Sequence, residues 1–247
     1  MIPLKSEEDL KLLRASGKIL AKIMRRLRES VDVGVSTSDI DKLAEDLINK
    51  ENARAAFKGY RGYPACICAS INEEVVHGIP GGRKLKEGDI FSLDVGLVYR
   101  GFYSDAAITV GVGKINPGLK KLIDATKNAL SEGIKQARPK NHLGDISYAI
   151  QNYAERHGFS VVRQFVGHGI GKALHEEPEI PNFGLPHRGA VLKSGMVLAI
   201  EPMINLGTWE TEILENGWTA VTKDRLPSAH FEHTVAITDK GAEILTQ

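Results

Sequence analysis

The sequence has no excess of charge of either sign and no long apolar run. It has 32 Lys and Arg against 31 Asp and Glu, a net charge of +1, which gives no general attraction to nucleic acid or to an anionic membrane. No apolar stretch approaches the ~20 residues that span a bilayer. The first residues also lack the basic start and apolar centre of a signal peptide. We therefore expect a cytoplasmic protein that binds neither nucleic acid nor membranes.

Cysteine is also scarce, because Cys66 and Cys68 are the only two. On a strand they would point the same way, but a disulfide across one intervening residue would strain the backbone. They also lack the further ligands of a structural zinc site. These features exclude a disulfide scaffold and a zinc finger, and they favour a reducing compartment.

The remaining composition is that of an ordinary globular protein, and 247 residues fit a single domain, 1–247. Helical periodicity and capping residues predict helices over 6–30, 36–52, 119–138 and 145–157. Short β-branched runs broken by glycine predict strands over 53–112 and 161–245. The sequence therefore predicts an α+β protein in which two helices are followed by a group of strands, and this arrangement occurs twice along the chain.

Short matches in the same order suggest an internal repeat, with halves of roughly 1–112 and 113–247. An acid follows six residues after a glycine in each half, at Asp94 and at Glu201. The other matches are 34–40 with 140–146, His77-Gly-Ile with His168-Gly-Ile, and the segment from Asp105 with the segment from Glu232. We therefore predict two related halves in one pseudo-symmetric domain.

The repeat pairs acids with acids. Asp94 and Glu201 stand at the predicted ends of apolar strands, and Asp105 lies in the return strand of a hairpin that turns near Arg100. A buried carboxylate costs free energy unless it is paired or bound to a metal. One such acid would more often cap a turn, and a lone His168 between glycines would more often be a packed residue. Four acids at matched positions make a common site the better interpretation.

Carboxylates that converge without a cation repel one another and raise each other's pKa. Four carboxylates and one imidazole are too many ligands for a closed tetrahedral zinc site, but they suit two ions that share ligands and a water molecule. Cobalt, manganese, iron and zinc are compatible with this donor set. The predicted metal ligands are Asp94, Asp105, His168, Glu201 and Glu232.

Several motifs together carry a resemblance to a known family. They are Asn72-Glu-Glu-Val-Val-His77-Gly-Ile-Pro80, Asp94 to Asp105, Gly167-His168-Gly-Ile-Gly171, His175-Glu-Glu-Pro178, Ile200-Glu201-Pro-Met203 and Phe231-Glu232-His-Thr234. The sequence resembles type I methionine aminopeptidases over essentially its whole length. The resemblance implies the pita-bread fold, with two pseudo-symmetric halves around a curved antiparallel sheet and helices on its outer face. It also implies metal-dependent removal of the N-terminal methionine from nascent proteins and peptides, with a preference for a small second residue.

The resemblance assigns roles to individual residues. Asp105 and Glu232 would bridge two divalent ions. Asp94 would complete the coordination shell of one ion, and His168 and Glu201 would complete that of the other. The catalytic residues would be His77, His175 and Glu201, of which the two histidines also face the substrate. An apolar methionine pocket without a charged end would consist of Phe57, Tyr60, Tyr63, Cys68, Leu174 and Trp218.

Two residues of this pocket depart from the family pattern. Leu174 stands where an aromatic residue is usual and Phe57 where a smaller one is usual, which leaves the shape of the pocket open. Asn72, Glu74 and Ser228 match positions that hold a monovalent cation in relatives. A monomer is expected, and transient contact with the ribosome is left open.

Two alternatives have the same fold. A proline-directed aminopeptidase or dipeptidase would share the five ligands, but those relatives usually carry an N-terminal domain for which this chain has no room. A non-catalytic pita-bread binding protein should have replaced ligands, and here all five are present. A module that uses the metal only structurally would be distinguished by removing the metal and measuring peptide cleavage.

Overall fold

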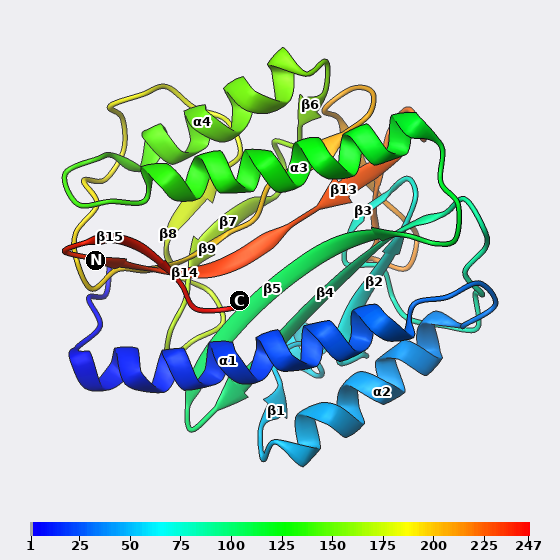
Figure 1. The fold of residues 1–247 in the computed structure, drawn as a ribbon, viewed down its shortest axis with the longest axis horizontal. Coiled ribbons are helices and arrows are strands. Elements are labelled where there is room, and N and C mark those ends of the chain that lie inside the picture. The colour runs from blue at the N-terminus through cyan, green and yellow to red at the C-terminus, as the bar shows by residue number, and fades with distance from the viewer. Residues whose placement is uncertain (1) are drawn as a thin grey trace.

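The computed structural model describes residues 2–247, in which four helices lie on one face of a curved sheet (Figure 1). Their bounds are α1 (Glu7–Ser30), α2 (Thr37–Lys50), α3 (Pro117–Gln136) and α4 (Leu143–Arg156). The side chains of Ser6 and Ser36 cap the first two helices, each in a capping box that satisfies backbone N–H groups of the first turn. The predicted helices are confirmed to within two residues at each end. None of the described helices is long and apolar enough to cross a membrane.

The main sheet of the described residues has nine strands in antiparallel pairs, with the order β1-β4-β5-β14-β9-β7-β8. In addition, β2 pairs with β4 beside β1, and β15 pairs with β14. The bounds are β1 (Arg54–Ala55), β2 (Ile67–Ile71), β4 (Ile90–Tyr99), β5 (Phe102–Gly111), β7 (Val166–Gly169), β8 (Glu176–Pro181), β9 (Val197–Ile200), β14 (Glu232–Thr238) and β15 (Gly241–Ile244).

Shorter elements surround this sheet. One small sheet joins β13 (Ser228–His230), β10 (Met203–Asn205) and β6 (Ser160–Val161), and another joins β11 (Thr211–Ile213), β12 (Ala220–Thr222) and β3 (Glu74–Val76). A 3₁₀ turn, η1 (Tyr60–Gly62), lies between β1 and β2.

The molecule has two halves, each with a helix pair packed on its own strands (Figure 1). Leu20 and Leu27 of α1 share one apolar core with Leu93 of β4. Leu122 of α3 shares another core with Leu198 of β9. The halves join where β5 pairs with β14. The predicted α+β architecture is confirmed, whereas the boundary near residue 112 stays a prediction.

The predicted position of Asp94 at the end of its strand was wrong, whereas the predicted hairpin that carries Asp94 and Asp105 is confirmed. Asp94 and Asp105 lie in the middle of β4 and β5, because the apolar alternation continues past them. Phe91, Leu93, Val95 and Leu97 face the helix-side core, and Asp94 faces the opposite side. Only the acids of the second half lie at strand ends: Glu201 follows β9 directly, and Glu232 begins β14.

The two cysteines do not point the same way. Cys66 precedes β2 and packs in the helix-side core, whereas Cys68 lies within β2 and faces the inner side of the sheet. The backbone N–H groups of Cys66 and Ile67 both donate to Asp41 Oδ1, which turns the chain just before the strand begins. Both thiols are buried and free.

Candidate active site

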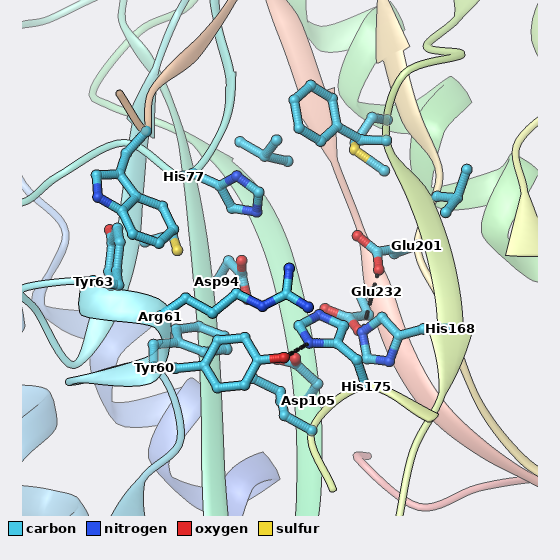
Figure 2. Close-up of a pocket in the computed structure, with 18 of the residues that line it drawn as sticks. Tyr60, Arg61, Tyr63, His77, Asp94, Asp105, His168, His175, Glu201 and Glu232 are labelled. Atoms are coloured by element: carbon cyan, nitrogen blue, oxygen red, sulfur yellow. Dashed lines mark hydrogen bonds and ion pairs between the residues drawn. The ribbon is translucent and has the colours of Figure 1, made fainter. Parts of the chain in front are cut away.

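A single cavity of about 270 Å³ opens on the inner side of the sheet. It is lined by every residue predicted for the site: the ligands Asp94, Asp105, His168, Glu201 and Glu232, the histidines His77 and His175, and the pocket residues Phe57, Tyr60, Tyr63, Cys68, Leu174 and Trp218. Figure 2 shows Glu201, Glu232 and His168 on one side of this cavity and Tyr63 on the other, with Asp94 between them.

The predicted ligands come from five neighbouring strands of the main sheet, in the order β4, β5, β14, β9 and β7, with Glu201 directly after β9. Ligand atoms of Asp105, His168 and Glu232 all lie within 4.8 Å of one another. His168 Nε2 lies 3.5 Å from Glu201 Oε1. The backbone of Asp105 is fixed to β14, since its N–H donates to Thr234 Oγ1 at 2.9 Å and its carbonyl accepts from the same hydroxyl at 2.8 Å. The ligands of both halves therefore meet where the two halves join.

Without a cation this cluster is electrostatically unfavourable. Burial raises the pKa of Asp94 well above its usual range, and the neighbouring Asp105 adds to the shift. Burial raises the pKa of Asp105 to about 7. The pKa values of Glu201 and Glu232 are also raised, first by burial and then by the other acids.

Two of these carboxylate oxygens, Asp94 Oδ1 and Glu232 Oε1, are buried without a hydrogen-bond partner among the described residues. Divalent cations would relieve both the repulsion and the missing partners. The residues present therefore fit a metal centre.

His168 is suited to the role of a neutral ligand. Burial lowers its pKa to about 3, and His175 adds to the shift. Its Nδ1 lies 2.9 Å from the carbonyl of Gly169, an arrangement that favours a proton on Nδ1 and leaves the Nε2 lone pair for a metal. The flanking glycines are required for close approach: a Cβ on Gly167 would lie 2.4 Å from Ala199 O, and one on Gly169 would lie 2.1 Å from Glu177 O.

The other two histidines lie beside the predicted metal ligands. The His175 ring lies 4.2 Å from the His168 ring, and its Nδ1 is 2.8 Å from the hydroxyl of Tyr60. His77 adopts a left-handed backbone conformation, with φ of 60°. It packs edge-on to Phe165 and Trp218, at ring distances of 5.5 and 6.5 Å.

Both histidines are neutral at neutral pH. Burial lowers the pKa of His77 to about 4, with a further contribution from His175. Burial also lowers the pKa of His175, and Arg61 adds to that shift. Each can therefore donate one N–H to a substrate.

The pocket beside the histidines is largely apolar, as predicted. Tyr63 packs edge-on to Trp218 at 5.1 Å, and its hydroxyl donates to the carbonyls of Gly78 and Ile67. Because that hydroxyl is already satisfied, Tyr63 presents only its ring to the cavity. Phe57 lies against Gly96 of β4, where a Cβ would come within 2.7 Å of the Phe57 ring.

The prediction that the pocket has no charged end was wrong, because the exposed side chain of Arg61 also lines the cavity (Figure 2). Its guanidinium carbon lies 5.5 Å from the centre of the Tyr60 ring. Its position in the sequence, between the predicted pocket residues Tyr60 and Tyr63, could have indicated that Arg61 lines the cavity. The other lining residues that sequence reasoning missed are Val76, Gln164, Phe165, Val166 and Met203. Of these, Val76 and Met203 lie within recognised motifs, and Phe165 and Val166 come directly before the motif that begins at Gly167.

His230 also went unrecognised. It is buried behind the acids, and its Nε2 lies 3.4 Å from Glu201 Oε2. A single histidine in an apolar strand carries no signal by itself, and only the pairing of β13 with β10 brings it to Glu201.

The residues suggested for a monovalent cation are partly assembled. The N–H of Ser228 donates to the carbonyl of Asn72 at 2.8 Å, so these two lie side by side. The Glu74 carboxylate accepts hydrogen bonds from Ile71 N and from Arg83. A monovalent cation at this place stays a prediction.

Comparison with known proteins identifies close relatives. The model of metallopeptidase family M24 matches residues 11–239. The chain is 52% identical to a methionine aminopeptidase of Clostridium perfringens, covering 100% of this chain and 99% of that relative. It is 48% identical to methionine aminopeptidase 1 of Bacillus subtilis, with 100% of both chains covered.

Solved structures of methionine aminopeptidases are also similar to this chain. The crystal structure of methionine aminopeptidase from Rickettsia prowazekii superposes with a TM-score of 0.99 at 42% identity, and that from Thermotoga maritima with 0.98 at 47%, each over 100% of both chains. A prolidase from Pyrococcus horikoshii, at 22% identity and a TM-score of 0.79, covers 99% of this chain and 63% of its own. It shows that the pita-bread fold is shared beyond the aminopeptidases.

Proposed function

Since the chain belongs to metallopeptidase family M24, among the methionine aminopeptidases, we propose that it removes the N-terminal methionine from peptides and nascent proteins with the aid of two divalent metal ions. The observation that carries this proposal is one cavity that joins five metal-type ligands, two neutral histidines and an aromatic pocket. The relatives and solved structures that carry the same name support it.

The ligand positions suggest how two ions would be held. Asp105 and Glu232, which come from the two strands that join the halves, would be shared between them. Asp94 would complete the shell on one side, and His168 with Glu201 the shell on the other. When bound, such ions lower the pKa of water and polarise a substrate carbonyl. The donor set is compatible with cobalt, manganese, iron or zinc.

The side chains around the ligands would perform the proton transfers. Glu201 would accept a proton from the attacking water and deliver it to the leaving nitrogen. His175, held by Tyr60 at 2.8 Å, would donate its N–H to the carbonyl oxygen as negative charge develops there. His77 would contact the peptide on the far side of the scissile bond, near the leaving nitrogen.

The aromatic pocket accounts for a preference for methionine. An unbranched thioether fits an irregular cavity and makes favourable contacts with the edges of rings such as Tyr63 and Trp218. A lysine side chain would lose its hydration among the aromatic rings and would also be repelled by Arg61, which lines the same cavity. The second residue would lie beside His77, which is itself wedged between Phe165 and Trp218, so a small second residue should be favoured.

A panel of short peptides tests this proposal. The protein is first stripped of metal and then reloaded with cobalt, manganese, iron or zinc in turn. With the metal that restores activity, we expect methionine-alanine-serine to be cleaved much faster than methionine-leucine-serine or leucine-alanine-serine. The Asp105→Asn chain, measured in parallel, should be inactive with every metal. If alanine-proline-serine were the best substrate, the proline-directed alternative would be correct. If cleavage survived complete metal removal, the metal centre would be excluded.

Three finer expectations stay predictions. They are transient contact with the ribosome, a monomeric state and location in the cytoplasm.

A further inference from the structure

We propose that His142, Asp145 and His187 form a second site for a divalent transition-metal ion, at the start of α4. One ligand atom from each of the three residues lies within 4.8 Å of the other two. None of the three lines the cavity that contains Glu232, so the site would be separate from the catalytic centre. Two imidazoles and a carboxylate are a donor set that zinc, cobalt and nickel accept.

The distances are close to those of a coordinated ion. His187 Nδ1 lies 3.6 Å from Asp145 Oδ1, and His142 Nδ1 lies 3.9 Å from Asp145 Oδ2. Ligand atoms bound tetrahedrally with bonds of 2.0–2.1 Å lie about 3.3 Å apart, so these pairs would have to close by about 0.3 and 0.6 Å. The two rings, whose centres lie 6.2 Å apart, would also have to turn toward each other. The two rings are nearly perpendicular, at 87°, and do not stack on each other. Their side chains are 31% and 83% exposed, which leaves them free to turn toward one ion.

The backbone that carries these side chains is already held in place. The two oxygens of Asp145 accept the N–H groups of His142 and His187, at 2.7 and 2.8 Å. The segment 188–192 runs beside 140–144, with Leu143 N donating to Ala190 O and Gly144 N donating to Arg188 O, both at 2.9 Å. An ion would therefore have to order only two histidine side chains, which keeps the entropic cost of binding low.

Gly144 permits this close packing of segments. A Cβ at this position would lie 2.3 Å from the carbonyl oxygen of Leu185, so a larger residue would push the two segments apart. The ligand set thus depends on a tight junction between α4 and the segment that connects β8 to β9. An ion bound there would fasten that segment to α4.

The N-terminus of a helix carries partial positive charge and disfavours a cation. Asp145, the third residue of α4, places a carboxylate at this end and offsets that charge. A purely structural Asp145 would cap α4 and hold His187 N–H without binding a metal. The two roles are distinguished by measuring metal binding.

The test is equilibrium dialysis of the full chain against Zn²⁺, with bound zinc counted by mass spectrometry. We expect the His142→Ala/His187→Ala chain to bind one ion fewer per chain than wild type at saturation. These substitutions leave the carboxylate of Asp145 and its backbone hydrogen bonds in place, so the fold should be retained, and circular dichroism checks this. His157→Ala is the matched control, because His157 is an exposed histidine at the other end of α4; this chain should bind as much zinc as wild type.

A second measurement locates the ion. With Co²⁺ in place of zinc, the amide resonances of residues 142–145 and 187–190 should broaden in wild type and stay sharp in the double variant. Equal zinc counts in wild type and double variant would overturn the proposal. Broadening that is the same in both would likewise overturn it, whatever the state of the catalytic centre.

Discussion

His175 is the clearest case of a site residue that would act on the substrate and not on the metal. Its ring stands at the exposed mouth of the cavity, next to His168, with its Nδ1 facing Tyr60. It is neutral, since burial and Arg61 both lower its pKa. A neutral imidazole in this position can donate a hydrogen bond to an oxygen that gains charge in the transition state.

We therefore predict that His175→Ala lowers the turnover of methionine-alanine peptides by ~10²–10³, the usual loss of one oxyanion donor. Its metal content should equal that of wild type, measured by mass spectrometry after dialysis. Tyr60→Phe is the control, since it keeps the ring and removes only the hydroxyl partner, and its loss should be smaller. Loss of metal in parallel with loss of rate would make His175 a ligand.

Strand β4 shows how one element serves both the core and the site. Its odd-numbered side chains from Phe91 to Leu97 pack against the helices, while Asp94 and Gly96 face inward. Gly96 has no side chain at the point where the Phe57 ring lies against the strand. The position of the Phe57 ring in the pocket wall therefore depends on the absence of a Cβ at Gly96.

We predict that Gly96→Ala displaces Phe57, because the new Cβ would lie 2.7 Å from its ring and 3.0 Å from the Ala56 methyl group. Forcing a methyl group into a filled core typically costs about 1–3 kcal/mol of unfolding free energy. The KM for methionine peptides should rise as well. Denaturant unfolding and steady-state kinetics measure the two effects. Gly82→Ala is the control, because nothing lies within 4 Å of its added Cβ; equal effects in both chains would refute this account.

At the level of the whole molecule, the acids of the two halves are brought together by folding itself. Folding without metal must bury four carboxyls whose pKa values are raised, that of Asp105 to about 7. A carboxyl with a raised folded-state pKa contributes stability that is complete below its unfolded pKa and is lost as the pH rises through the folded pKa. The metal-free protein should therefore lose stability as these groups ionise.

We predict that the unfolding free energy of the metal-free chain falls as the pH rises above about 6.5, because the pKa of Asp105 is about 7 and those of Asp94, Glu201 and Glu232 are also raised, while unperturbed histidines are already mostly neutral there. With metal bound, the same interval should show little change or a gain, because protons no longer compete for the ligands. Urea unfolding at each pH measures this. The Asp105→Asn/Glu232→Gln chain, which has fewer acids to ionise, should show a shallower fall when metal-free. A metal-free stability that rises across this interval would contradict the prediction.

Local physical chemistry in the sequence was sufficient to locate the helices and to single out the acids and the histidine that share one cavity. Helical periodicity and the capping serines depend on neighbours within a few residues, so α1 and α2 could be located from the chain alone. The acids could be recognised because a carboxylate in an apolar strand is costly wherever that strand lies. The matched motifs of the two halves then indicated that these acids belong to one site.

Properties that depend on contacts between distant segments needed the tertiary structure. Asp94 seemed to end a strand, because a sequence does not show that a buried strand continues past a charged residue whose partners come from other strands. His230 reaches Glu201 only through the pairing of β13 with β10, and Arg61 reaches the cavity only because the turn at η1 lies over it. His142, Asp145 and His187 meet only because the segment before β9 packs on α4. The order of residues along the chain was enough to locate the helices and to single out the acids. Which side chains share a cavity depends on the packing of one half against the other, because strands and loops far apart in the chain supply them.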